Sequence, residues 1–349
     1  MGVSRPRNPR ATLTAVRALS SALRTGWPLA AAVLVALLPG VALAHGINPP
    51  EPSPSLLITG WEFDPVFILV AGAVTWWYVA TARAVGKRYP ASPWPRKRSA
   101  FFLSGVGVAA FAVMSPFAAY DVVLFSVHMW QHLLLMMVSA PLLLLGTPIT
   151  LLLRSVSSKT RREVIIPFLH SRAVRVITFP VFAWLAFTFT MWGSHYSPLF
   201  NAALENVWIH RFEHMLYVTV ALMFWWQAIA ADPTPWRMPH PVRLLYVFLQ
   251  MPQNTFLALS IYDTQRVLYD HYATTVRTWG PTPLEDQQLA GITMWVIGDI
   301  LFLTAVAFII AGWVKHEEFE GKRQDRARAR EKAAHEREAA ASAAAEPSH

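Results

Sequence analysis

Two pairs of histidines stand four residues apart in segments that are apolar enough to cross a bilayer. His128 and His132 open HMWQHLLLMMVSAPLLLLGTP, and His210 and His214 lie in HRFEHMLYVTVALMFWW. Residues four apart share one face of a helix, with Cβ atoms about 5–6 Å apart. Polar side chains in lipid cost free energy unless they are paired or functional. The spacing therefore predicts that each pair faces the protein interior and can hold a metal ion.

The amino-acid composition narrows the choice of metal. The chain has no cysteine, which excludes disulfides and thiolate metal sites. Several methionines lie near the histidines, and of these Met251 and Met294 are the candidate soft ligands. The nearby methionines are Met129, Met136, Met137, Met215, Met251 and Met294. Imidazole with thioether, without a cage of carboxylates, suits copper better than magnesium or calcium. The alternative is that the histidines form hydrogen bonds between helices and that the methionines only pack.

Other polar residues are expected at a similar depth in the membrane. We expect Glu213 and Asp299 to fix the tautomers of the imidazoles. Gln131 and Gln253 are expected to form hydrogen bonds between helices, with Asn254 beside them. Isolated histidines outside the spans are weaker candidates, because a single histidine is more often only solvated. These accessory candidates are His45, His195 and His271.

Seven apolar segments can carry these residues as membrane-spanning helices. Most are close to the ~20 residues that a span needs. Only helices satisfy their backbone polar groups within one segment in lipid. The sequence therefore predicts an all-α membrane protein whose seven-helix domain covers residues 66–314. The expected spans are 66–84, 100–118, 122–145, 175–192, 207–230, 241–261 and 289–313.

Basic residues gather in alternate loops and predict the orientation. Segments 83–98 and 154–175 each carry six basic residues, whereas 192–206 carries none. By the positive-inside rule, the N-terminus of the domain lies outside and the C-terminus in the cytoplasm. The net charge of +9 is then a topology signal, so nucleic-acid binding is not needed to explain it.

The two ends of the chain are expected to differ from the membrane domain. Residues 1–44 have a basic lead, a 12-residue apolar stretch and an A-x-A pattern, which predict a cleaved export signal. An uncleaved N-terminal helix is the alternative. Cleavage would leave His45 at the N-terminus of a short external segment, 45–65. Residues 315–349 form a charged cytoplasmic tail to which we assign no chemistry.

Four stretches resemble the multi-span CtaG family of cytochrome c oxidase (caa-type) assembly factors. They are HMWQHLLLMMVSAPLLLLGTP, HRFEHMLYVTVALMFWW, PQNTFLALSIY and DQQLAGITMWVIGD. The resemblance covers about residues 60–315 and implies a multi-pass protein of the bacterial plasma membrane that helps to mature a haem–copper oxidase. Its implied partners are an oxidase subunit and a copper donor protein. The family motifs match at His128, His132, His210, His214 and Asp299.

Together these inferences favour an assembly factor that holds or delivers copper at an outward-facing His/Met site in the membrane. Other functions stay open. Paired histidines on two helices also ligate haem iron, so a haem-binding or haem-handling protein is one alternative. A metal-free scaffold and a copper transporter are two more. No nucleophile–base pair, phosphate loop or pair of acids argues for an enzyme.

Overall fold

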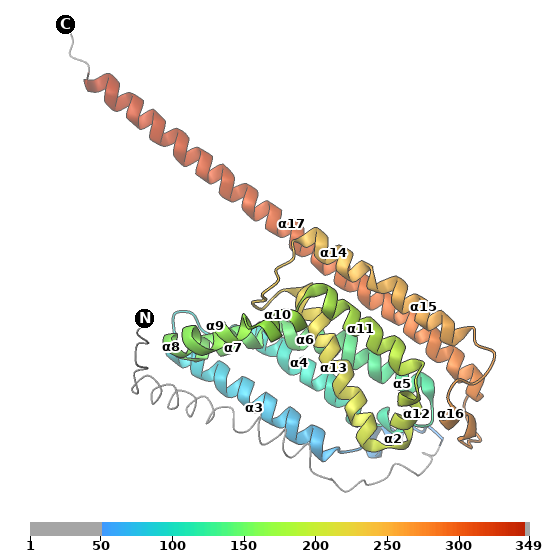
Figure 1. Cartoon of the computed structure of the whole chain (residues 1–349). Helices are drawn as coiled ribbons and strands as arrows, with labels where there is room; N and C mark the ends of the chain where they lie inside the picture. The colour runs from blue at the N-terminus through green and yellow to red at the C-terminus, as the bar shows by residue number, and fades with distance from the viewer. Residues whose placement is uncertain (1–50, 346–349) are drawn as a thin grey trace, which may run out of the picture.

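The computed structural model describes residues 51–345, so the predicted export signal and His45 lie outside the described residues. Every regular element within 51–345 is a helix, which confirms the predicted all-α class (Figure 1). The elements are α2 (Leu56–Thr59), α3 (Pro65–Arg88), α4 (Arg96–Met114), η1 (Ala118–Tyr120), α5 (Phe125–Leu133), η2 (Leu134–Ser139), α6 (Ala140–Leu145), α7 (Pro148–Ser155), α8 (Ser158–Thr160), η3 (Arg161–Ile165), α9 (Ile166–Leu169), α10 (Arg172–Ile177), α11 (Pro180–His195), α12 (Pro198–Glu205), α13 (Val207–Ile229), α14 (His240–Phe248), α15 (Gln250–Tyr262), α16 (Asp270–Thr274) and α17 (Pro283–Ala345).

Among the described residues, five helical stretches are long and apolar enough to cross a membrane. They are Pro65–Arg88, Arg96–Tyr120, Phe125–Ser155, His240–Tyr262 and Pro283–Ala333. The other two expected spans correspond to α11 and α13. α11 has only 16 residues, and α13 has 23 residues but begins with four ionisable side chains in two turns. The chain is therefore a multi-span membrane protein. Five of its helices are long and apolar enough to cross the membrane, whereas α11 is shorter and α13 is more polar.

Polar caps and prolines set where the helices begin. The Asp64 carboxylate accepts hydrogen bonds from the backbone N–H groups of Val66 and Phe67, at 2.8 and 3.0 Å. Asn206 caps α13 in the same way, accepting from Trp208 N–H at 2.9 Å. A side chain that accepts from the first free N–H groups satisfies donors that the helix leaves unpaired. The Asn206 cap fixes the start of α13, and so the position of the histidines four and eight residues after it.

The third span contains a wide turn just after its histidines. η2 is a π-helix that separates α5 from α6, and such insertions often mark functional sites. Trp225 of α13 donates its indole N–H to the Met136 carbonyl in this turn, at 2.9 Å. Trp225 of α13 thus hydrogen-bonds to the irregular turn that follows the histidines of the third span.

α17 forms one side of the bundle and packs along α14 and α15 (Figure 1). Glycine makes close contact possible here, because a Cβ at Gly291 would lie 3.0 Å from the Ala258 carbonyl oxygen. Beyond the bundle, the tail continues α17 as a single projecting helix that ends at Ala345 (Figure 1). The main apolar core, which includes Phe224 and Phe302, lies between α13, α14 and α17.

Short helices lie at both ends of the bundle. α2, α12 and α16 lie where α5 and α13 begin, whereas α8 and α9 lie at the opposite end (Figure 1). α12 packs against α13 and also contacts α16. The end of the bundle that carries the histidines is therefore covered by its own loops.

Candidate metal centre

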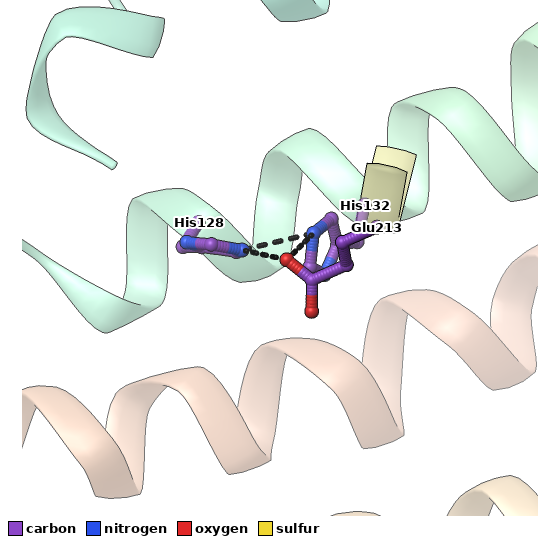
Figure 2. Close-up of side chains that lie close together, drawn as sticks. All are labelled: His128, His132 and Glu213. Atoms are coloured by element: carbon purple, nitrogen blue, oxygen red, sulfur yellow. Dashed lines mark hydrogen bonds and ion pairs between the residues drawn. The ribbon is translucent and has the colours of Figure 1, made fainter. Parts of the chain in front are cut away.

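α5 and α13 bring two histidines and a glutamate together inside the bundle (Figure 2). His128 Nε2 lies 2.9 Å from His132 Nε2. Glu213 Oε2 lies 3.8 Å from the first of these nitrogens and 3.9 Å from the second. A point equidistant from the three atoms is about 2.1 Å from each, within the 2.0–2.2 Å of Zn–N and Zn–O bonds. The three atoms can therefore coordinate one transition-metal ion.

The other predicted histidine pair adjoins this group. The His210 ring lies 5.2 Å from the His128 ring and 4.3 Å from the His214 ring, between centroids. The His214 ring in turn lies 5.7 Å from that of His132. The two predicted histidine faces thus meet, and the four imidazoles form one continuous cluster.

Burial makes the arrangement unusual. Glu213 and His128 are completely buried and His132 is 2% exposed. Within the part of the chain that the structure describes, neither oxygen of Glu213 nor Nδ1 of His132 has a hydrogen-bond partner. Buried polar atoms are nearly always paired, so such exceptions point to an ion or to a strained functional group. The unpartnered oxygens of Glu213 fit a cation placed between this carboxylate and the two Nε2 atoms.

Glu213 differs from the prediction in its role. We expected Glu213 to fix the tautomer of an imidazole, but its carboxylate faces the same point as the two Nε2 atoms. The reason is helical geometry. Residues three and four apart share a face, so residue 213 shares a face with His210 and Tyr217, beside His214. The donor set of the compact group is therefore two imidazoles and one carboxylate.

Two of the imidazoles have further polar neighbours. Gln131 donates its amide N–H to the Ala112 carbonyl at 3.0 Å, and its Oε1 lies 3.1 Å from His214 Nε2. The expected interhelical role of Gln131 is thus seen between α4, α5 and α13. His210 Nε2 lies 3.9 Å from the carboxylate of Asp121.

The predicted residues of α15 and α17 bond to one another. Asp299 accepts from Asn254 Nδ2 at 3.2 Å and from Thr255 Oγ1 at 2.8 Å. Asn254 also donates to the Met294 carbonyl at 3.1 Å. Asp299 was expected beside an imidazole, but its carboxylate instead joins these two helices, because α15 is the neighbour that α17 packs against most closely.

The two methionines lie in apolar packing. Met294 is 1% exposed in the main core, and Met251 packs against that core. Neither thioether belongs to the compact group of His128, His132 and Glu213. The side chain of Gln253, on the same helix as Met251, makes no hydrogen bond to another described residue. The soft-ligand roles of Met251 and Met294 stay predictions.

The accessory histidines have different surroundings. His195 is buried, with Nδ1 2.8 Å from the Met191 carbonyl oxygen and its ring 5.3 Å from that of Phe200. Phe200 also lies 5.0 Å from the His128 ring, so it packs against both imidazoles. His271 Nε2 lies 2.8 Å from the Val122 carbonyl oxygen, at the edge of the centre.

Sequence reasoning missed Asp121 and Tyr272, whose polar groups lie near the histidines. Asp121 and Tyr272 come from segments outside the expected helix faces, and Tyr272 OH lies 3.3 Å from His128 Nδ1. For Asp121 a signal existed, because an acid directly before an apolar span needs a partner when it is buried. No local pattern points to Tyr272, which is separated from His128 by 144 residues.

Comparison with known proteins agrees with the motifs. The sequence model of the cytochrome c oxidase caa3 assembly factor family (Caa3_CtaG) matches residues 76–316. This range includes the four clustered histidines, Glu213 and Tyr272. The resemblance predicted from the four motifs is therefore confirmed.

Curated relatives come from mycobacteria and are longer than this chain. Uncharacterized proteins of Mycobacterium bovis and Mycobacterium tuberculosis are each 28% identical over 285 residues, which is 80% of this chain and 43% of each relative. One of Mycobacterium leprae is 27% identical over the same coverage. The chain thus spans less than half the length of these relatives. No solved structure matches it.

Proposed function

The chain belongs to the cytochrome c oxidase caa3 assembly factor family, and on that premise we propose that its buried histidine centre holds copper for a haem–copper oxidase. The observation that carries the proposal is the convergence of His128, His132 and Glu213 on one point. Copper binds such nitrogen and oxygen donors more tightly than the other divalent first-row metals do. The copper is cargo, which the protein holds and passes to an oxidase subunit.

The proposal gives each part of the centre a task. His128 and His132 bind the ion through their Nε2 atoms, and Glu213 binds it and offsets its charge. Aromatic rings shield the ion from water, with Tyr217 4.4 Å from the His132 ring and Phe200 5.0 Å from the His128 ring. His210 and His214 adjoin the group, and His214 is partly exposed. They are suited to receive the ion as it enters or leaves.

The proposed arrangement in the membrane has seven spans, with α11 and α13 joining the five apolar ones. The protein lies in the bacterial plasma membrane, with the histidine end of the bundle outward. The predicted cytoplasmic loops are then those around α7 to α10, where Arg154 contacts the rings of Tyr89 and Trp94. Arginines and aromatic rings of this kind are typical of membrane–water interfaces. An outward site is the side from which copper would reach a membrane-embedded oxidase subunit.

Metal analysis of the purified full chain tests the proposal. We expect about one copper ion per chain in the wild type and at least a tenfold loss in His132→Ala, because a ligand is removed. His170→Ala is the matched control, since that side chain is exposed and bonds only to the Ile166 carbonyl. Equal copper in all three proteins would refute the ligand assignment. A Soret absorbance band in the wild type would assign haem instead.

A further inference from the structure

The loop between α15 and α17, residues 263–282, hydrogen-bonds to the turn that leads into α5. Tyr272 OH donates to the Asp121 carbonyl at 2.6 Å, and His271 Nε2 lies 2.8 Å from the Val122 carbonyl oxygen. Arg277 donates to the Val123 carbonyl at 2.5 Å. Three side chains of one loop thus hold three consecutive carbonyls just before the helix that carries His128. The loop fixes where that helix starts.

One of these side chains also reaches the centre. Tyr272 is 2% exposed, and its hydroxyl lies 3.3 Å from His128 Nδ1. A tyrosine hydroxyl has a single hydrogen, which here is directed to the Asp121 carbonyl. Toward His128 the hydroxyl therefore acts as an acceptor, and His128 Nδ1 carries the hydrogen.

The tautomer of His128 follows from this direction. A neutral imidazole with a hydrogen on Nδ1 has its lone pair on Nε2. That Nε2 atom lies 2.9 Å from His132 Nε2 and 3.8 Å from the Glu213 carboxylate. We infer that Tyr272 is a positioning residue, which holds His128 in the tautomer whose Nε2 lone pair faces the centre. Its effect on copper rests on the function proposed above, but the tautomer itself does not.

Tyr269 provides a matched control in the same loop. It is 3% exposed, and its hydroxyl also donates to a backbone carbonyl, that of His195, at 3.2 Å. Its ring packs on Phe125, as the ring of Tyr272 does. Replacement by phenylalanine removes one buried hydroxyl and one bond to a carbonyl in either case. Only at Tyr272 does it also remove the contact to His128.

Nitrogen-15 NMR of histidine-labelled, metal-free full chain tests the tautomer directly, with His128→Gln used to assign the signal. We expect the Nδ1–H form of His128 in the wild type and in Tyr269→Phe. Tyr272→Phe should increase the share of the Nε2–H form, with the hydrogen bond from His128 to the Asp121 backbone as the remaining constraint. An unchanged His128 signal in Tyr272→Phe would overturn the inference.

Copper titration of the same proteins tests the consequence. Loss of an outer partner of a metal-bound histidine weakens metal affinity by about 10–100-fold, so we expect that loss in Tyr272→Phe with a melting temperature matching Tyr269→Phe. Equal weakening in both variants would show a merely structural role and would overturn the inference. A wild type that binds no copper would refute the proposed function, and the NMR result would then decide the tautomer on its own.

Discussion

At the residue scale, Glu213 stands apart from the other buried acids. Asp286 accepts from the Phe125 N–H and from Ser126 Oγ, both at 2.6 Å. Asp232 accepts from the Ile149 N–H at 3.0 Å and from Thr150 Oγ1 at 2.6 Å. Among the described residues, no donor meets hydrogen-bond geometry at either carboxylate oxygen of Glu213, and burying a poorly hydrogen-bonded carboxylate costs free energy. A buried carboxylate that faces two imidazoles supports the proposal that Glu213 is a ligand.

Glu213→Gln should therefore separate metal binding from stability. The amide keeps the size of the side chain but removes a ligand charge, so copper content should fall while the melting temperature of the metal-free protein stays equal or rises. Asp286→Asn is the contrasting control, because it disturbs two satisfied hydrogen bonds and should cost about 1–3 kcal/mol. Calorimetry in detergent and metal analysis measure both effects. A lower melting temperature in metal-free Glu213→Gln would contradict this account.

At the element scale, the π-turn of the third span is held from outside its own helix. η2 lies directly after His132, and the indole N–H of Trp225 bonds to the Met136 carbonyl. An irregular turn has backbone groups that need partners beyond the helix ladder. α13 thus supplies both the carboxylate of the centre and the side chain that supports the facing helix.

Trp225→Phe should destabilise the protein more than Trp226→Phe does. Both substitutions replace a partly or fully buried indole with a smaller phenyl ring. The indole N–H of Trp226, however, has no hydrogen-bond partner among the described residues. We expect an additional loss of about 1–3 kcal/mol for Trp225→Phe, since the Met136 carbonyl is left unpaired. Thermal unfolding of the two variants measures this difference. Equal melting temperatures would mean that the bond contributes nothing to the turn.

At the scale of the whole molecule, the two ends of the bundle differ. One end carries the histidines beneath α12 and α16, and the other carries α7 to α10 and the projecting part of α17 (Figure 1). The histidine end is bordered by loops with few basic residues, and the other end by loops rich in them. This polarity is what the positive-inside rule uses to orient a multi-span protein.

The orientation can be tested in the native background, because the chain has no cysteine. Thr278→Cys and Ser158→Cys place single exposed thiols at opposite ends of the bundle. In right-side-out membrane vesicles, a membrane-impermeant maleimide should label Thr278→Cys at once. Ser158→Cys should react only after permeabilisation. The reverse pattern would put the histidine end in the cytoplasm.

Several parts of the structure could be predicted because they depend on local periodicity. The apolar runs predicted helices, and the four-residue spacing placed His128 with His132 and His210 with His214. The family resemblance rested on linear motifs and was confirmed. Other parts depended on how helices rotate against each other. Asp299 turned toward Asn254 and Thr255, and no periodicity within α17 specifies which neighbour its acid meets.

The sequence by itself determined which helix faces carry imidazoles, because covalent spacing and the 3.6-residue turn are properties of one segment. Only the tertiary structure decided that those faces meet, that Glu213 completes the group, and that Tyr272 contacts it. These pairings join segments separated by about 80 to 144 residues. They follow from the packing of several helices and loops at once, which shape complementarity between distant surfaces decides and local sequence does not.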